Sequence, residues 1–282
     1  MLGFKEYTVL RLAQQIIGRL KVLVDHSIVH GDIQPGNFLL GKDVHSNRTV
    51  FLIDFGLSST VSTANSDVTS ITTNTNEYNE GNSINNSVHS FNSHLNTPTT
   101  TTTQNIQSNQ ISKVISSKFG TLQFASASTL QGLGSPVFRD DLESCAYTLS
   151  YLLLGHLPWT HQDMALYTLD HDKSLISSNP SEYSTRRQHI IQSVIDMKKR
   201  VTVSDLCESF ANTGIGEVIN NLLVQSKQLQ SAEKPDYDFV LSMIDKLLLE
   251  AKLSNTAEDG LYDWEAMGML WSTTDGSTMK TE

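Results

Sequence analysis

The sequence predicts a mainly helical fold with a few short strands and one long polar insertion. Apolar residues recur at helical spacing in several long segments, and glycine and proline residues separate these segments. One short β-branched and aromatic run, residues 49–53, is typical of a strand. At 282 residues the chain is long enough to bury a sizeable core.

Composition excludes several classes of protein. A net charge of −10 disfavours binding to nucleic-acid phosphates. The two cysteines, Cys145 and Cys207, lie far apart without a CxxC pattern, which argues against a disulfide framework or a zinc site. No apolar run approaches the roughly 18 residues that span a bilayer, and the N-terminus lacks a signal-peptide core. We expect a monomeric intracellular protein, cytoplasmic or nuclear.

The first segment is predicted to be a helix buried in a larger body. Its apolar residues recur at i, i+4, i+7, i+11 and i+14: Val9, Ala13, Ile16, Leu20 and Leu23. A glycine- and proline-containing loop, residues 31–37, comes next. The run 49–53 then predicts a buried strand that ends in a glycine turn at Asp54-Phe55-Gly56.

The stretch from Ser58 to Ser112 differs sharply from its flanks. Roughly two-thirds of it is Ser, Thr, Asn or Gln, and it contains no Lys or Arg. Such a tract buries too little apolar surface to offset the entropy lost on ordering. We therefore expect a disordered insertion.

Helical patterns resume after the insertion. The segment 141–154 is apolar and closes with Gly155 and Pro158, both of which end helices. Further helices are predicted at 181–198, 215–228 and 237–252.

Three polar residues have the spacing of a phosphoryl-transfer site. Asp32 and Asn37 lie five positions apart in a loop, and Asp54 follows at a strand end. An Asp or Asn alone in a loop is usually a turn former. When a helix and a loop with Asp32 and Asn37 precede a strand that ends at Asp54-Phe55-Gly56, however, the residues together form the protein-kinase signature. Asp32 suits the carboxylate that accepts the proton of the attacking hydroxyl, and Asn37 and Asp54 offer the oxygens that Mg²⁺ prefers.

Several motifs together resemble the casein kinase I family of Ser/Thr kinases. They are His30–Asn37, Phe51–Leu57, Phe119–Ser126 (similar to TGTARYAS), Arg139–Ser144 (similar to RRDDLES), Leu157–Trp159 and Lys234–Tyr237. The resemblance implies a kinase C-lobe, with residues 1–57 and 113–270 on either side of the insertion at 58–112 and a flexible tail at 271–282. It also implies ATP and Mg²⁺ as cofactors and a protein as substrate or partner.

The resemblance assigns roles to individual residues. Asp32 would be the catalytic base, Asn37 and Asp54 the Mg²⁺ ligands, and Gly56 the turn beside the ion. Asp141 would accept backbone hydrogen bonds from the catalytic loop, and a helix N-cap is an equally compatible role for it. Thr121 would lie near the base on the substrate side, or would be a plain turn residue after Gly120.

The chain departs from the family pattern at charged positions. Gly31 replaces the arginine of HRD, Gln34 the catalytic-loop lysine, and Gln123 the arginine of TGTARYAS. No glycine-rich loop or Val-Ala-Ile-Lys strand occurs, so we expect a C-lobe portion whose N-lobe is absent from this chain and whose activity alone is little or none. Two interpretations remain: a fragment of a Ser/Thr kinase, or a pseudokinase that acts as an interaction module.

Overall fold

The computed structural model describes residues 3–41, 46–61, 121–253 and 262–266. The N-terminal part contains α1 (Glu6–Asp25), β1 (Ile28–Val29), the 3₁₀ helix η1 (Pro35–Asn37), β2 (Phe38–Leu40), β3 (Val50–Leu52), the 3₁₀ helix η2 (Phe55–Leu57) and β4 (Ser59–Thr60). The remaining elements are α3 (Thr121–Phe124), α4 (Ala127–Gln131), α5 (Phe138–Leu154), α6 (Thr160–Asp170), α7 (Lys173–Ser178), α8 (Pro180–Arg200), α9 (Val203–Cys207), η3 (Glu208–Phe210), α10 (Gly214–Gln228), α11 (Tyr237–Leu253) and α12 (Asp263–Ala266). The predicted mainly helical fold with a few short strands is confirmed.

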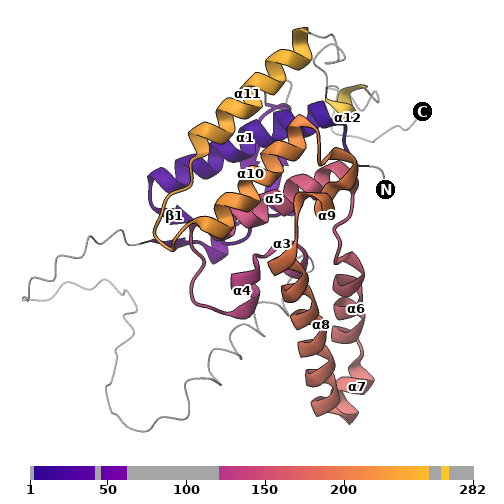
Figure 1. Cartoon of the computed structure of the whole chain (residues 1–282). Helices are drawn as coiled ribbons and strands as arrows, with labels where there is room; N and C mark the ends of the chain where they lie inside the picture. The colour runs from indigo at the N-terminus through magenta and orange to yellow at the C-terminus, as the bar shows by residue number, and fades with distance from the viewer. Residues whose placement is uncertain (1–2, 42–45, 62–120, 254–261, 267–282) are drawn as a thin grey trace, which may run out of the picture.

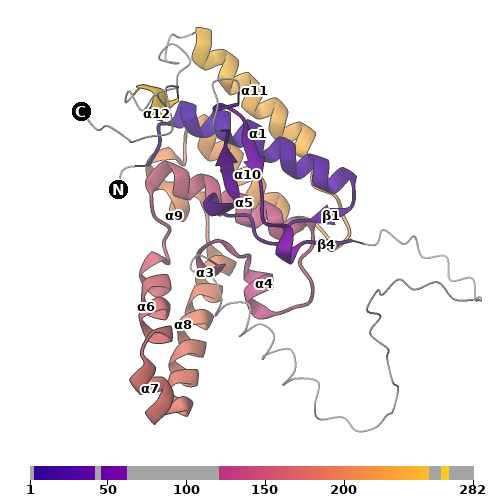
Figure 2. The same ribbon diagram turned by 180° about the vertical axis from the view of Figure 1, so that it is seen from behind.

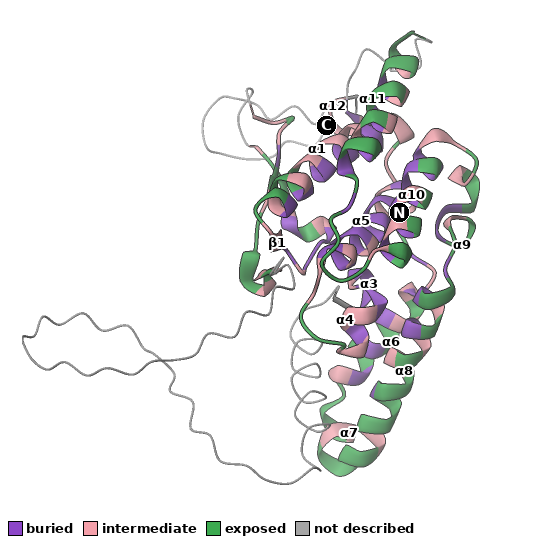
Figure 3. Cartoon of the chain, turned by 60° about the vertical axis from the view of Figure 1, so that its left-hand side comes forward, coloured by how far each residue is buried: buried purple, intermediate pink, exposed green. Residues whose placement is uncertain are grey.

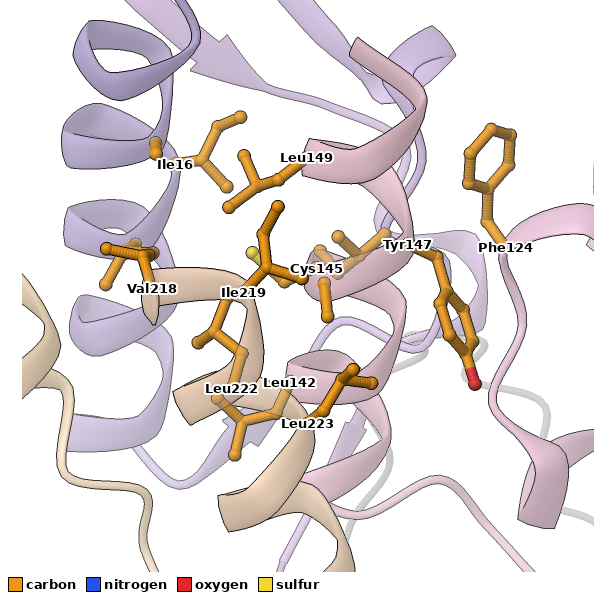
Figure 4. Close-up of a cluster of buried hydrophobic side chains, with 14 of the residues drawn as sticks. Ile16, Phe124, Leu142, Cys145, Tyr147, Leu149, Val218, Ile219, Leu222 and Leu223 are labelled. Atoms are coloured by element: carbon orange, nitrogen blue, oxygen red, sulfur yellow. The ribbon is translucent and has the colours of Figure 1, made fainter. Parts of the chain in front are cut away.

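Helix α5 forms the centre of the molecule. It packs most extensively against α10, and α1 packs against both α5 and α11 (Figure 1). Apolar side chains of α1, α5 and α10 meet in one core (Figure 4), for example Ile16, Leu149 and Ile219, each at most 1% exposed. Because both faces of α5 are covered, most of its residues are buried, polar ones included (Figure 3). Such a helix holds its side chains rigidly, which suits it to position a site.

Helices α6, α7 and α8 extend from this core as an arm (Figure 1). Helix α8 begins at a proline, and the Asn179 side chain caps it by accepting from Glu182 N at 3.2 Å. The C-terminal end of α8 lies next to α3 (Figures 1 and 2), and there the buried Lys198 donates from Nζ to Leu122 O at 2.8 Å.

The strands form two small antiparallel pairs beside α1 and α5 (Figure 2). In one pair Leu39 lies opposite Phe51, and in the other Val29 lies opposite Ser59. The expectation of a buried strand at 49–53 was wrong in part: Val50 is buried, but Phe51 is 47% and Ile53 37% exposed. Alternation along β3 puts one face on the core and leaves the other open.

The structure moves two predicted boundaries. Ser58 to Val61, assigned to the insertion, are ordered: β4 pairs with β1, and Val61 N donates to Ser27 O at 2.9 Å. The rest of the insertion and the tail at 271–282 lie outside the described residues. Helix α5 starts at Phe138, three residues before its predicted start. Among the helices that the structure describes, none is long and apolar enough to span a membrane.

Candidate active site

The candidate site begins with the loop after β1, which is fastened to α5 by Asp141. Asp141 Oδ2 accepts from His30 N at 2.7 Å, and Oδ1 accepts from Gly31 N at 2.9 Å. Asp141 lies in the first turn of α5 but is not its N-cap, which is Val137. Burial raises the pKa of Asp141 to about 7, although the two N–H donors lower it. One carboxylate thereby fixes the backbone on the N-terminal side of Asp32.

The carboxylate of Asp32 is held by two neutral amides. Gln34 Nε2 donates to Oδ1 at 2.8 Å, and Asn37 Nδ2 donates to Oδ2 at 2.9 Å. Asn37 Nδ2 also donates to the backbone oxygen of Asp32, at 2.7 Å. All three side chains are buried, so their hydrogen bonds define one orientation of the carboxylate. Because Nδ2 of Asn37 donates to both acceptors, these bonds leave its Oδ1, an acceptor, for another ligand.

Asp54 is brought to the same loop by the end of β3. Ile53 N donates to Asn37 O at 3.0 Å, and a ring nitrogen of His30 lies 3.0 Å from Ile53 O. Asp54 has a left-handed backbone with φ of 64°, which is uncommon for a residue with a side chain. The structure therefore brings Asp32, Gln34, Asn37 and Asp54 onto two segments that are bonded to each other.

Gly56 contributes in a different way from the one expected. The positive φ belongs to Asp54, and Gly56 N donates to Asp54 Oδ1 at 3.4 Å. A Cβ on Gly56 would lie 3.1 Å from that same oxygen. The glycine thus leaves space for the carboxylate, and the tight turn is made by Asp54 itself.

Gly31 also has a geometric role that the sequence did not reveal. Its φ is +78°, and a Cβ there would lie 2.8 Å from Leu57 O. The chain after Asp-Phe-Gly therefore passes where the side chain of residue 31 would begin. A glycine at this position suits both the conformation and the close approach.

The donor set fits a magnesium ion. Asn37 supplies an amide oxygen and Asp54 a carboxylate, both hard donors. Among the described residues there is no group of three or more His, Cys, Asp or Glu side chains that could hold a metal. Asn37 and Asp54 would give two protein oxygens, which suits an ion such as Mg²⁺ that usually keeps water and substrate phosphates as its other ligands.

The two candidates near the substrate side differ in what the structure shows. Thr121 begins α3 and so has helical backbone, and its side chain lies outside the described part of the structure. Gln123 is 7% exposed, and its amide nitrogen donates to Thr160 Oγ1 at 3.0 Å. Gln123 therefore points into the protein and not toward a substrate.

An exposed apolar surface beside the site was missed in the sequence. Leu39 and Phe51 lie opposite each other on β2 and β3 and are 49% and 47% exposed, and Phe55 is 45% exposed. The β-branched and aromatic run 49–53 predicted a buried strand, although alternation along a strand would have indicated one open face.

Comparison with known proteins agrees with the kinase-like motifs of the sequence. No protein-family model matches the chain. Casein kinase I homolog 3 of Schizosaccharomyces pombe is 26% identical over 263 residues, and casein kinase I homolog 2 of the same yeast is 24% identical over 262 residues. Each alignment covers 93% of this chain and 44% of the yeast protein, so the chain spans a little under half the length of these relatives. The resemblance that the motifs indicated is confirmed: the chain is casein kinase I-like, with a mainly helical fold of the kinase C-lobe type.

Proposed function

We propose that the chain carries the catalytic loop of a Ser/Thr protein kinase of the casein kinase I type, which transfers the γ-phosphoryl group of ATP to a protein hydroxyl. The observation that carries the proposal is the hydrogen-bonded group of Asp32, Gln34 and Asn37, joined to Asp54 through the bond from Ile53 N to Asn37 O. Fold similarity alone would not support an activity.

Asp32 is the general base in this proposal. Its carboxylate accepts the proton of the substrate hydroxyl as the oxygen attacks phosphorus. The amides of Gln34 and Asn37 hold the carboxylate without giving it a counter-charge, because neither side chain is ionised. These two hydrogen bonds orient the Asp32 carboxylate for the substrate hydroxyl.

Asn37 and Asp54 are the residues that would hold Mg²⁺, which when bound neutralises charge on the nucleotide phosphates. The open face formed by Leu39 and Phe51 lies on the strands that follow Asn37 and precede Asp54. It offers an apolar surface on which the flat base of ATP can stack.

The protein substrate is not selected by acidity in this proposal. Gln123 is neutral and is engaged with Thr160, so it cannot pair with a phosphate or carboxylate of the substrate. Between His161 and Ser174 the sequence has one Lys and no Arg, which leaves little positive charge to attract an acidic peptide.

A second function, a pseudokinase that binds partners without catalysis, is favoured by one observation. The two side chains that donate to the Asp32 carboxylate are neutral, and Gly31 has no side chain. An active site lacking these positive charges loses electrostatic stabilisation of the transferred phosphoryl group, typically a factor of about 10² or more per contact.

Transfer of radiolabelled phosphate from ATP to dephosphorylated casein separates the two functions. The 282-residue chain is expected to transfer slowly at best, and fusion to the N-lobe of a casein kinase I protein is expected to raise the rate. Asp32→Asn should abolish the gain, whereas Asp196→Asn, an exposed carboxylate on α8, should not. A fusion that binds Mg·ATP but transfers no phosphate would support the pseudokinase and contradict the kinase.

A further inference from the structure

The short segment Leu122–Ala127 is held mainly by side chains of other elements. It spans the end of α3 and the start of α4, helices of four and five residues that supply few internal hydrogen bonds. Instead, Trp159 Nε1 donates to Gln123 O at 2.8 Å, and Ser126 Oγ donates to Asp140 Oδ1 at 2.7 Å. The position of this backbone therefore depends on distant residues.

Lys198, on α8, makes three of the hydrogen bonds that hold this segment. It is 1% exposed, and its Nζ donates to Leu122 O at 2.8 Å, to Gln123 O at 3.2 Å and also to Ala125 O. The same nitrogen lies 4.8 Å from the ring centroids of both Tyr147 and Trp159. An ammonium has three N–H donors, so the carbonyls of one short segment use all of them, while two aromatic faces surround the charge.

Glu143, on α5, holds the other end of the segment. Its Oε1 accepts from Ala127 N at 2.9 Å and from Tyr147 OH at 2.6 Å. Tyr147 leaves α5 on the side away from Ile219 and Leu222, toward Phe124 of α3 (Figure 4). The backbone is thus held at its carbonyls by a cation from α8 and at an amide by an anion from α5.

The first turns of α5 connect this segment to the catalytic loop. Asp141 accepts from His30 N and Gly31 N, while Asp140 and Glu143 accept from Ser126 Oγ and Ala127 N. Three acidic residues within four positions of one rigid helix therefore fix two segments relative to each other.

We propose that Lys198 and Glu143 are positioning residues, a buried pair of opposite charge that holds Leu122–Ala127 at a fixed place relative to the catalytic loop. Its link to substrate binding rests on the proposed kinase function, since the resemblance puts this segment on the substrate side. The hold on the backbone itself does not depend on that function.

The charges of the pair depend on each other. Burial lowers the pKa of Lys198 to about 7, whereas the charges of Glu143 and of Asp163 on α6 raise it. Burial likewise raises the pKa of Glu143, and the donors Tyr147 and Ala127 and the charge of Lys198 lower it. Removing the charge of Glu143 therefore lowers the pKa of Lys198 further and disfavours its charged form. Glu143→Gln should for this reason loosen both ends of the segment.

Amide hydrogen exchange of the full chain tests the hold directly. Lys198→Met removes the charge at similar length, and Lys199→Met makes the same change at the exposed neighbouring residue. We expect Lys198→Met and Glu143→Gln to speed exchange of residues 122–127 by about tenfold or more, and Lys199→Met to leave it unchanged. Lys198→Arg, which keeps the charge and several donors, should recover most of the protection.

Affinity for dephosphorylated casein, measured by fluorescence anisotropy, tests the positioning role. Lys198→Met should weaken it several-fold, and Lys198→Arg should restore it. The proposal would be overturned if residues 122–127 exchanged as slowly in Lys198→Met and Glu143→Gln as in Lys199→Met. It would also be overturned if these residues exchanged as fast in Lys198→Arg as in Lys198→Met. A wild-type chain that binds no casein would count against the proposed kinase function, and the exchange comparison would then decide whether Lys198 and Glu143 hold the segment.

Discussion

Gly31 permits a sharp prediction, because the residue that replaces the HRD arginine occupies a place where a side chain does not fit. Its φ of +78° disfavours any residue with a Cβ, by about 1–2 kcal/mol. An added Cβ would also lie 2.8 Å from Leu57 O, a backbone atom at the end of η2, two residues before β4. Overpacking of this kind typically costs about 1–3 kcal/mol. We expect Gly31→Ala to lower the free energy of unfolding by about 2–5 kcal/mol.

Urea unfolding followed by far-ultraviolet circular dichroism measures this change. With a denaturant slope of about 2 kcal/mol per molar, the midpoint should fall by about 1–2.5 M. Gly18→Ala is the matched control, since Gly18 is inside α1 and a Cβ there meets no atom within 4 Å. That control should stabilise the protein by about 0.5–1 kcal/mol. Gly31→Ala with a midpoint within 0.2 M of the wild type would refute the reasoning, because neither the conformation nor the close approach would then matter.

Three further changes have defined outcomes. Between about pH 4 and 7 the raised pKa lets folded Asp141 hold a proton that the unfolded chain has lost, so its contribution to the free energy of unfolding falls as pH rises. Urea unfolding at pH 4.5 and 7.5 should therefore show a decrease in the free energy of unfolding that is about 3 kcal/mol larger for the wild type than for Asp141→Asn, and equal decreases would contradict this prediction. Gln34→Lys puts an ammonium beside Asp32 and should raise casein phosphorylation by the N-lobe fusion about 10-fold to 100-fold; an unchanged rate would argue against a phosphoryl group at this place. Gln15→Ala removes the bonds to Arg48 O and Val50 N and should destabilise the protein by about 1–2 kcal/mol in the same urea assay, with faster amide exchange at Val50; unchanged exchange there would show that Gln15 does not secure β3.

Long helices with strong apolar periodicity were predictable from the sequence. The segment 181–198 was expected as a helix and is observed as Pro180–Arg200, and 237–252 is observed as Tyr237–Leu253. Helices α6 and α7 were not predicted, because few apolar residues of α6 face the core and α7 has none that is buried. Helix α9 had a signal that was overlooked, the capping box formed by Thr202 and Asp205.

The candidate site was predictable to the extent that it is local in the sequence. Asp32, Gln34 and Asn37 lie within six positions, and the loop that carries them folds their side chains together. Lys198 was not predictable in this way, since it is 76 positions from Leu122 and belongs to a basic helix end, Lys198-Lys199-Arg200. Such an end is typical of a solvent-exposed terminus that complements the helix dipole, and only the packing of α8 beneath α3 buries its first lysine.

The central claim is that Asn37 and Asp54 hold Mg²⁺ with a nucleotide beside Asp32, and calorimetric titration of the chain with ATP tests it most directly. ATP binding should require Mg²⁺, should be weakened about tenfold or more by Asp54→Asn, and should be unchanged by Asp196→Asn. Binding of equal strength with and without Mg²⁺, or binding that Asp54→Asn leaves intact, would contradict it.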